Sequence, residues 1–404
     1  MVKRGKEFYN RYFARQSRFS ILPPEDKYLF RISPKYKLNI IGSGMMGIEH
    51  LRTTYLEGRA IIHGIYDPNP KSVTATQNVL SQIDPEQKLK IYDTLKNACM
   101  DPDVDGLIIS TPNFSHISVI KEAIKSKKHI LLEKPMATTI PDAYEIYKIA
   151  EDYPSVFQVG LQYRFKAMYV EAIYEALKHK KLGDIKMISI SEYRFPFLDK
   201  VNQWNKFNQY SGGTLVEKCC HYFDLMNLFA QSRPKKVYAI GSMAVNFKEF
   251  EYNGRKSDIL DNAIVSVDYE NGVKANFNLC MFSPQFYEEL TICGDEGYLH
   301  SYENIDYLPG TQPKTYLELK FGEESASRIS QPCYPKYIEE SGHSGATFFE
   351  HKYFIDTIEG KQTSVATGKE GFWSIVVGYA AQKSIELGTP IIIHDLLKDF
   401  SLNI

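Results

Sequence analysis

The segment GGTLVEKCCHYFDLM, residues 212–226, places a carboxylate, two thiols and an imidazole within the short run from Glu217 to His221. In one continuous helix Glu217 and His221 would lie four residues apart and share a face, whereas Cys219 and Cys220 would point elsewhere. This spacing predicts an acid–base pair, in which the carboxylate orients the imidazole and favours its protonated form, and it argues against a metal site. A helix-surface ion pair without a function is the alternative.

A second chemical signal is the run IIGSGMMG, which has the G-x-G-x-x-G spacing between an apolar run and a helix start. The first glycine permits the tight turn, the second lets a pyrophosphate approach the backbone, and the third lets helix and strand pack closely. The residues expected to contact the cofactor here are Gly42, Gly44, Met45, Met46 and Gly47. Asp67 ends the next apolar run, where a carboxylate would bind the ribose hydroxyls and repel a 2′-phosphate. The pattern predicts NAD in preference to NADP, and a purely structural glycine turn is the alternative.

Two polar clusters follow apolar runs further along the chain. One is STPNFSH, from Ser110 to His116, and the other is Glu133-Lys134-Pro135. Ligands of doubly wound sheets bind beyond the carboxyl ends of strands, so both clusters are candidates for the site. Pro135 restricts Lys134 to extended geometry, which would aim the lysine toward the ligand. A surface salt bridge is the alternative for the Glu-Lys pair.

Strand and helix patterns alternate from residue 37 to 157, which predicts a Rossmann-type, doubly wound parallel sheet. Residues 158–404 read as an α/β domain with a large, open, mainly antiparallel sheet, because long strand patterns are joined by tight turns such as Glu270-Asn271-Gly272. Residues 1–36 are expected to form a basic, aromatic arm. The predicted domains are therefore this arm, a dinucleotide-binding domain (37–157) and a second domain (158–404).

The composition of the 404-residue chain is ordinary for a soluble globular protein. The net charge of −1 gives no field for nucleic acid or an acidic membrane surface. The apolar runs are far shorter than the ~18 residues of a membrane span. The six cysteines lack C-x-x-C spacing, so reduced thiols, no metal and a cytoplasmic location are expected.

These motifs together resemble the Gfo/Idh/MocA oxidoreductases. The resemblance runs from about residue 37 to 300 and rests on the glycine turn, T-P-N-x-x-H at 111–116, E-K-P at 133–135, V-G-x-x-Y-R-F at 159–165 and G-G-x-L-x-(acid)-x-x-x-H at 212–221. It implies a tightly held nicotinamide cofactor, sugar-like or cyclitol substrates, and a homodimer or homotetramer formed through the C-terminal sheet. By this resemblance residues 158–404 are expected to be a substrate-binding and oligomerisation domain. Further cofactor-binding residues expected are Thr111, Pro112, Asn113, His116, Glu133, Lys134 and Gln162.

The expected reaction is hydride transfer from a secondary alcohol to nicotinamide. The family places its catalytic histidine at His221 and an aspartate where this chain has Glu217, which is longer by one methylene. His221 would take the hydroxyl proton and Lys134 would stabilise the developing alkoxide, although the residues leave open which of the two accepts the proton. The residues expected to face the substrate are Tyr163, Arg164, Arg194, Lys200, Trp204, His221 and His343. Basic and aromatic side chains suit a sugar with a negative substituent, and solvated surface residues are the alternative.

Two further functions are compatible with the same motifs. Some relatives are glycosidases that oxidise a sugar hydroxyl, eliminate the aglycone, add water and reduce the ketone again, so NAD is regenerated. An anionic glycoside such as a sulfoquinovoside would suit the basic residues. Other relatives are non-catalytic sugar sensors, which usually lose the lysine or histidine that this chain retains as Lys134 and His221.

Overall fold

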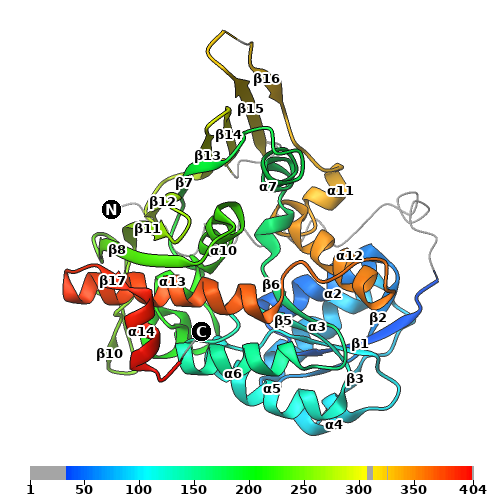
Figure 1. The fold of residues 1–404 in the computed structure, drawn as a ribbon. Coiled ribbons are helices and arrows are strands. Elements are labelled where there is room, and N and C mark those ends of the chain that lie inside the picture. Colours follow the sequence, from blue (N-terminus) through cyan, green and yellow to red (C-terminus); the bar gives the residue numbers. More distant parts are fainter. Residues whose placement is uncertain (1–32, 307–312, 325, 403–404) are drawn as a thin grey trace. The chain divides into compact units, whose positions relative to one another are not determined.

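The structure is a computed structural model that describes residues 33–306, 313–324 and 326–402 (Figure 1). Residues 1–32, which make up most of the predicted N-terminal arm, lie outside the described residues. The chain divides into two compact units. The first contains the residues up to 137 together with 142–165 and 334–371, and the second contains 138–141, 166–333 and the residues from 372 onward.

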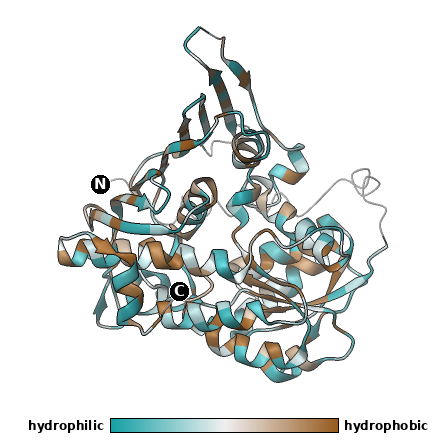
Figure 2. Ribbon diagram, viewed as in Figure 1, coloured by the Kyte–Doolittle hydropathy of each residue, from teal (hydrophilic) through white to brown (hydrophobic). Residues whose placement is uncertain are grey.

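The first unit is built on a parallel sheet. Among the described residues its six strands have the order β3-β2-β1-β4-β5-β6, which is the Rossmann order with the direction of strand addition reversing after β1. Every pair in it is parallel. Strands β1, β4 and β5 are almost wholly buried, as expected for a sheet covered on both faces. In Figure 2, helix α6 shows mixed brown and teal bands, which fits a helix with one buried and one exposed face.

The elements of the first unit are β1 (Tyr36–Ile41), α2 (Met45–Glu57), β2 (Ala60–Tyr66), α3 (Pro70–Ile83), β3 (Lys90–Ile91), α4 (Leu95–Met100), β4 (Gly106–Ile109), η3 (Asn113–Ser115), α5 (His116–Ala123), β5 (His129–Glu133), α6 (Ile140–Glu151), β6 (Phe157–Gly160), η5 (Gln162–Phe165), α11 (Lys336–Glu339), η8 (His343–Gly345) and α12 (Ala346–Ile358).

The late segment 334–371 returns to the first unit. Phe354 and Ile355 of α12 are buried in the same core cluster as Leu38, Ile40 and Leu51. Helix α12 therefore packs on α2 as an additional layer of the Rossmann fold. The expected boundary between residues 157 and 158 did not anticipate this return.

The second unit contains a large mixed sheet. Its described strands have the order β16-β15-β14-β13-β7-β12-β11-β8-β17, and all neighbours are antiparallel except β7 and β12, which are parallel. One face of the sheet is buried, as the alternation of buried and accessible residues along β11 and β13 shows. Helix α10 contacts β7, and α7 contacts β14 and β15.

The elements of the second unit are α7 (Ala167–Ile173), the π-helical turn Tyr174–Lys178, β7 (Ile185–Tyr193), η7 (Val201–Lys206), α8 (Asn208–Ser211), α9 (Thr214–Glu217), α10 (Cys220–Ala230), β8 (Pro234–Ser242), β9 (Glu251–Tyr252), β10 (Arg255–Lys256), β11 (Asn262–Tyr269), β12 (Lys274–Cys280), β13 (Phe286–Gly294), β14 (Gly297–Ile305), β15 (Lys314–Phe321), β16 (Arg328–Ser330), α13 (Gly368–Leu387), β17 (Ile391–Ile392) and α14 (Ile393–Asp399). Helix α13 begins in the first unit and continues into the second.

The run V-G-x-x-Y-R-F at 159–165 is divided between two elements, because β6 ends at Gly160 and Gln162–Phe165 form a 3-10 turn. One local expectation was wrong. The helix expected to carry both Glu217 and His221 is two helices, because α9 ends at Glu217 and α10 begins at Cys220.

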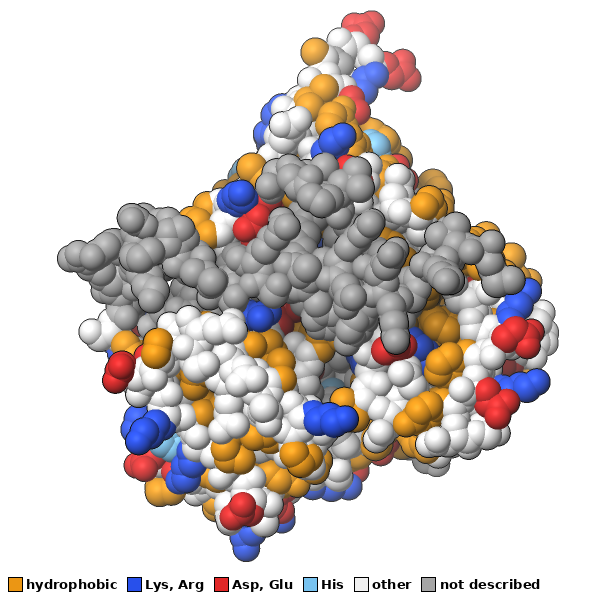
Figure 3. All heavy atoms as spheres, turned by 180° about the vertical axis from the view of Figure 1, so that it is seen from behind, with side chains coloured by type: hydrophobic (Ala, Val, Ile, Leu, Met, Phe, Trp, Pro, Cys, Tyr) orange, Lys and Arg blue, Asp and Glu red, His pale blue; other side chains and the backbone are white. Residues whose placement is uncertain are grey.

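The surface carries charges of both signs. On the face seen in Figure 3, lysine, arginine, aspartate and glutamate side chains of the described residues are interspersed with apolar ones. Among the helices described, none is both long enough and apolar enough to span a lipid bilayer.

Candidate active site

The glycine turn has the close contacts that its spacing predicts. Gly42 follows β1 with φ +91°, and a Cβ there would lie 2.7 Å from the backbone nitrogen of Thr111. A Cβ on Gly47 would lie 2.4 Å from the carbonyl oxygen of Gly42. A Cβ on Gly44, by contrast, would have no heavy atom within 4 Å. The turn is therefore packed on both sides and open at Gly44, and Met45 and Met46 follow it half-buried at the start of α2.

Asp67 lies directly after β2 and is bonded to this turn. Its Oδ2 accepts a hydrogen bond from the backbone N–H of Ser43 at 2.7 Å, and its Oδ1 accepts one from the N–H of Asn69 at 2.8 Å. The side chain is half-buried. The carboxylate therefore both supports the glycine turn and remains accessible beside it.

The loop after β4 contains a buried amide with an open donor. Asn113 is 5% exposed, and its Nδ2 has no hydrogen-bond partner among the described residues. Thr111 and Pro112, which precede it, are half-buried. A buried amide donor without a protein partner is costly unless a ligand or water completes it.

His116 has a different role from Asn113. Its two ring nitrogens lie 3.0 Å from the carbonyl oxygens of Pro135 and Thr111. Burial lowers the pKa of His116, so the neutral ring donates to one of these carbonyls. The imidazole therefore connects the loop after β4 to the loop after β5.

Gln162 offers the second open amide. It is fully buried at the start of η5, and neither its Nε2 nor its Oε1 has a hydrogen-bond partner among the described residues. The open position at Gly44, the carboxylate of Asp67 and the unpaired amides of Asn113 and Gln162 fit a bound dinucleotide with a carboxamide and hydroxyl groups.

Glu133 and Lys134 lie at the carboxyl end of β5. Glu133 is the last residue of the strand and is 4% exposed, and it lies 2.9 Å from His50 Nε2. Lys134 follows half-buried, and its bond to Pro135 is cis. The strand thus buries the glutamate and leaves the lysine accessible.

Three predicted substrate residues belong to the first unit. The rings of Tyr163 and His343 lie 6.2 Å apart, and His343 Nδ1 is 2.7 Å from Glu49 Oε1. Arg164 is 7% exposed and donates a hydrogen bond to the carbonyl oxygen of Val365. The structure therefore brings Tyr163 and His343 together and gives Arg164 a contact within the protein.

His221 and Glu217 belong to the second unit, and both are buried, with exposed fractions of 2% and 3%. Glu217 Oε1 accepts a hydrogen bond from Lys200 Nζ at 3.0 Å. Cys219 and Cys220 are fully buried between them, and burial raises the pKa of the Cys219 thiol well above its ordinary value. These cysteines behave as small core residues.

The other candidates of the second unit lie in the segment 194–206. Arg194 is half-buried and donates from Nε to the carbonyl oxygen of Phe195 at 3.0 Å. The ammonium of Lys200 lies 4.5 Å from the ring centroid of Trp204, which is 8% exposed. Lys200 is thus engaged by both Trp204 and Glu217.

Sequence reasoning missed two buried polar groups. In the second unit, Lys166 pairs with Glu288 and Glu303, which oppose each other on β13 and β14. In the first unit, His50 and Glu350 lie beside Glu133. A charged residue at an inward position of an alternating strand would have signalled Glu288, but no local pattern signals the meeting of α2 and α12.

Comparison with known proteins identifies two consecutive family domains along the chain. Residues 36–161 match the oxidoreductase family with an NAD-binding Rossmann fold, and residues 174–393 match the C-terminal alpha/beta domain of that oxidoreductase family. The chain belongs to the Gfo/Idh/MocA oxidoreductase family. As a member of it, the chain is an oxidoreductase whose first unit is an NAD-binding Rossmann domain.

Similar proteins cover nearly the whole of this Gfo/Idh/MocA chain. An uncharacterized oxidoreductase, YrbE of Bacillus subtilis, is 24% identical over 358 residues, covering 88% of this chain and 96% of that protein. Myo-inositol 2-dehydrogenase of Thermotoga maritima is 22% identical over 353 residues, with 87% and 96% covered.

Solved structures of the same fold include enzymes with bound cofactor. Levoglucosan dehydrogenase in complex with NADH matches with a TM-score of 0.72 and 17% identity, covering 89% of this chain and 99% of that one. The WlbA dehydrogenase of Bordetella pertussis, in complex with NADH and UDP-GlcNAcA, matches with a TM-score of 0.70 and 20% identity, covering 89% and 98%.

Proposed function

We propose that this oxidoreductase is an NAD-dependent dehydrogenase that oxidises a secondary hydroxyl of a sugar, a sugar derivative or a cyclitol. The observation that carries the proposal lies at and after the carboxyl ends of the first unit's strands. There a Cβ at Gly44 would meet no atom within 4 Å, and the buried amides of Asn113 and Gln162 have atoms without protein partners among the described residues. Asp67 and Lys134, which follow β2 and β5, are half-buried. The matched relatives that act on inositol support the substrate class.

Bound NAD supplies the hydride acceptor, and the protein residues handle the hydroxyl group. As the C–H bond breaks and its electron pair leaves, the hydroxyl proton passes to His221, so that the alcohol becomes a ketone. The ammonium of Lys134 donates a hydrogen bond to the oxygen that develops negative charge. Asp67 binds the ribose hydroxyls and disfavours a 2′-phosphate, which favours NAD over NADP.

We propose that Glu217 is a positioning residue, which acts on the reaction through the imidazole of His221. Because Glu217 also accepts from Lys200, its negative charge is partly balanced by the lysine. Replacing Lys200 would remove the hydrogen bond that holds the Glu217 carboxylate in place. We therefore assign Lys200 to the support of the catalytic group, and Tyr163, Arg194 and His343 to substrate recognition.

The test is a turnover assay with NAD and a panel of sugars, sugar acids and cyclitols. Lys134→Met and His221→Asn are each expected to lower kcat by about 10²–10⁴-fold, with NAD affinity within a few fold of the wild type. Lys125→Met is the control, because Lys125 forms an exposed pair with Glu122 on the surface. Near-normal turnover in both site variants would overturn the proposed mechanism.

The same assay separates the alternative reactions. A dehydrogenase accumulates NADH together with the ketone product. A redox-neutral glycosidase would release the aglycone of an anionic glycoside without net NADH, and a non-catalytic sensor would bind sugar without either product.

The second sheet is proposed to form a homodimer or homotetramer. Its outward face carries the exposed apolar residues Met187, Tyr238, Ile240 and Ile264, of which Ile240 and Ile264 are paired across β8 and β11. Tyrosines continue this face, with Tyr302 and Tyr316 stacked at 5.2 Å. Exposed apolar patches of this kind mark association surfaces. Ile240→Lys together with Ile264→Lys should convert the oligomer to monomers in sedimentation velocity, and an unchanged state would refute the assignment.

A further inference from the structure

Three buried side chains of the first unit converge from three elements. They are His50 of α2, Glu133 at the end of β5 and Glu350 of α12, with exposed fractions of 0%, 4% and 0%. One ligand atom from each lies within 4.8 Å of those of the other two. An imidazole nitrogen and two carboxylate oxygens so close together form a donor set suited to a metal cation.

Glu350 is the residue that the protein leaves unsatisfied. Neither of its carboxylate oxygens has a hydrogen-bond partner among the described residues. Burial, together with the charges of Glu133 and Glu49, raises the pKa of Glu350 well above its ordinary value. A buried carboxylate without a donor or cation costs several kcal/mol, so this side chain calls for a positively charged or proton-donating partner.

Hydrogen bonds with surrounding residues orient the side chains of the cluster, in the way that outer residues orient the ligands of a metal site. His50 Nδ1 lies 2.8 Å from His351 Nε2, and Glu133 Oε2 accepts the backbone N–H of Lys134 at 3.0 Å. At this distance His351 Nε2 can accept a hydrogen bond from His50 Nδ1–H. In that tautomer His50 Nε2 presents its lone pair to the cluster, 2.9 Å from Glu133 Oε1.

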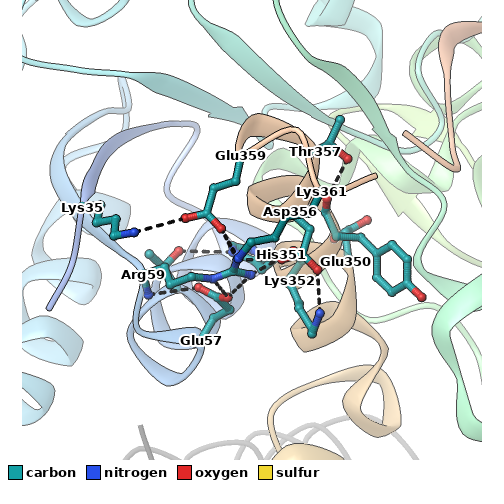
Figure 4. A network of polar contacts seen from close by, with 12 residues as sticks. Lys35, Glu57, Arg59, Glu350, His351, Lys352, Asp356, Thr357, Glu359 and Lys361 are labelled. Atoms are coloured by element: carbon teal, nitrogen blue, oxygen red, sulfur yellow. Dashed lines mark hydrogen bonds and ion pairs between the residues drawn. The ribbon is translucent and has the colours of Figure 1, made fainter. Parts of the chain in front are cut away.

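The backbone that carries Glu350 is held in place, because α12 is anchored by ion pairs and by core contacts. Figure 4 shows Arg59 at the end of α12. Its Nη1 donates hydrogen bonds to Asp356 Oδ1 at 2.6 Å and to Glu359 Oε2 at 2.9 Å. Arg59 also donates to Glu57 of α2 at 2.6 Å. Phe354 and Ile355 of the same helix are in the core. The position of Glu350 is therefore a property of the packed unit.

We propose that His50, Glu133 and Glu350 bind a divalent transition-metal cation, of the Zn²⁺ or Mn²⁺ type, inside the first unit. The imidazole favours these ions over Mg²⁺ and Ca²⁺, which prefer oxygen ligands alone. A double positive charge balances the two buried carboxylates and gives Glu350 the partner that it lacks. The ion would connect α2, β5 and α12, and it would hold the strand end from which Lys134 extends.

The experiment measures metal content in the full-length protein. The chain is produced in media supplemented with Zn²⁺, Mn²⁺ or Co²⁺, dialysed against a chelator to remove surface ions, and analysed by inductively coupled plasma mass spectrometry. The wild type is expected to retain about one equivalent of one of these metals, and the Co²⁺ form to show visible d–d absorption. The Glu350→Gln variant keeps the shape of the side chain and removes its charge, and it is expected to contain at least about tenfold less metal than the wild type.

Asp103→Asn is the matched control. Asp103 is exposed and, with His63 and Asp101, forms the other group of potential metal ligands found among the described residues. Its substitution should leave the metal content unchanged if the buried site holds the ion.

Wild-type protein that contains no stoichiometric metal from any of the three media overturns the proposal, whether or not the variants fold. Equal metal content in wild type and Glu350→Gln overturns it as well. A metal-free wild type with the same melting temperature as Glu350→Gln would instead show that Glu350 holds a proton, since glutamine mimics the neutral acid.

Discussion

Two buried amides after strands of the first unit have atoms without protein partners among the described residues, whereas three buried glutamates of the second sheet are neutralised by two lysines. Asn113 and Gln162 leave amide groups open. In the second unit Glu192, Glu288 and Glu303 oppose one another across three strands, and Lys166 and Lys218 neutralise them. The difference fits the proposal that a ligand completes the first set, while the second set is an internal part of the folded unit.

The largest expected effect comes from breaking the paired set. Burial by itself would raise the pKa of Glu288, but in the native protein the attraction of Lys166 lowers it. Lys166→Met would leave Glu288 and Glu303 buried without their common cation. The free energy of unfolding should fall by about 3–5 kcal/mol. Chemical denaturation measures it, with Lys186→Met as a surface control that should change stability by less than about 0.5 kcal/mol. A loss no larger than that of the control would contradict the comparison.

Lys206 gives a pH-dependent effect in the same unit. It is 1% exposed, donates to the carbonyl oxygens of Phe197 and Leu198 at 2.8 and 3.2 Å, and burial lowers its pKa to about 8 from 10.5. Between these values the unfolded chain binds more protons than the folded one, so stability should rise with pH across that window. The increase in the free energy of unfolding that Lys206 causes across this window is at most about 3 kcal/mol.

Denaturation curves recorded across this pH range should show a smaller rise for Lys206→Met than for the wild type. Lys248→Met, at an exposed position, should behave like the wild type. Identical pH dependence in all three proteins would count against a buried, readily deprotonated lysine.

Two substitutions in the glycine turn should affect NAD affinity and stability differently. Gly44→Ala meets no atom within 4 Å in the protein, so it should fold normally, yet its methyl group would occupy the space of the pyrophosphate. We expect about 100-fold weaker NAD binding, or about 2.7 kcal/mol, by calorimetric titration. Gly47→Ala, whose Cβ would lie 2.4 Å from the Gly42 oxygen, should also lower the melting temperature. Unchanged NAD affinity in Gly44→Ala would exclude this turn as the phosphate site.

The smallest effect tests the open amides directly. Gln162→Met removes two unpaired buried polar atoms, so the cofactor-free protein should be as stable as the wild type or slightly more stable. NAD affinity should nevertheless fall about tenfold, or about 1.4 kcal/mol. Loss of stability without loss of affinity would place Gln162 among the internally paired groups instead.

The sequence by itself determined the features that depend on local spacing. The glycine pattern, the alternation of strands and helices, and the polar residues directly after apolar strands predicted the parallel sheet, the NAD-binding turn and the Glu133-Lys134 strand end. Each of these follows from a few consecutive residues, because backbone geometry and the direction of parallel strands fix where such residues lie.

Only the tertiary structure decided the contacts between distant segments. The return of α12 to the Rossmann core, the meeting of Glu350 with His50, and the pairing of Glu217 with Lys200 depend on packing and on side-chain charge. The break between α9 and α10 likewise replaced a regular helix that local spacing favoured. These features depend on the burial of whole surfaces and on the neutralisation of buried charges, and no short stretch of sequence specifies either.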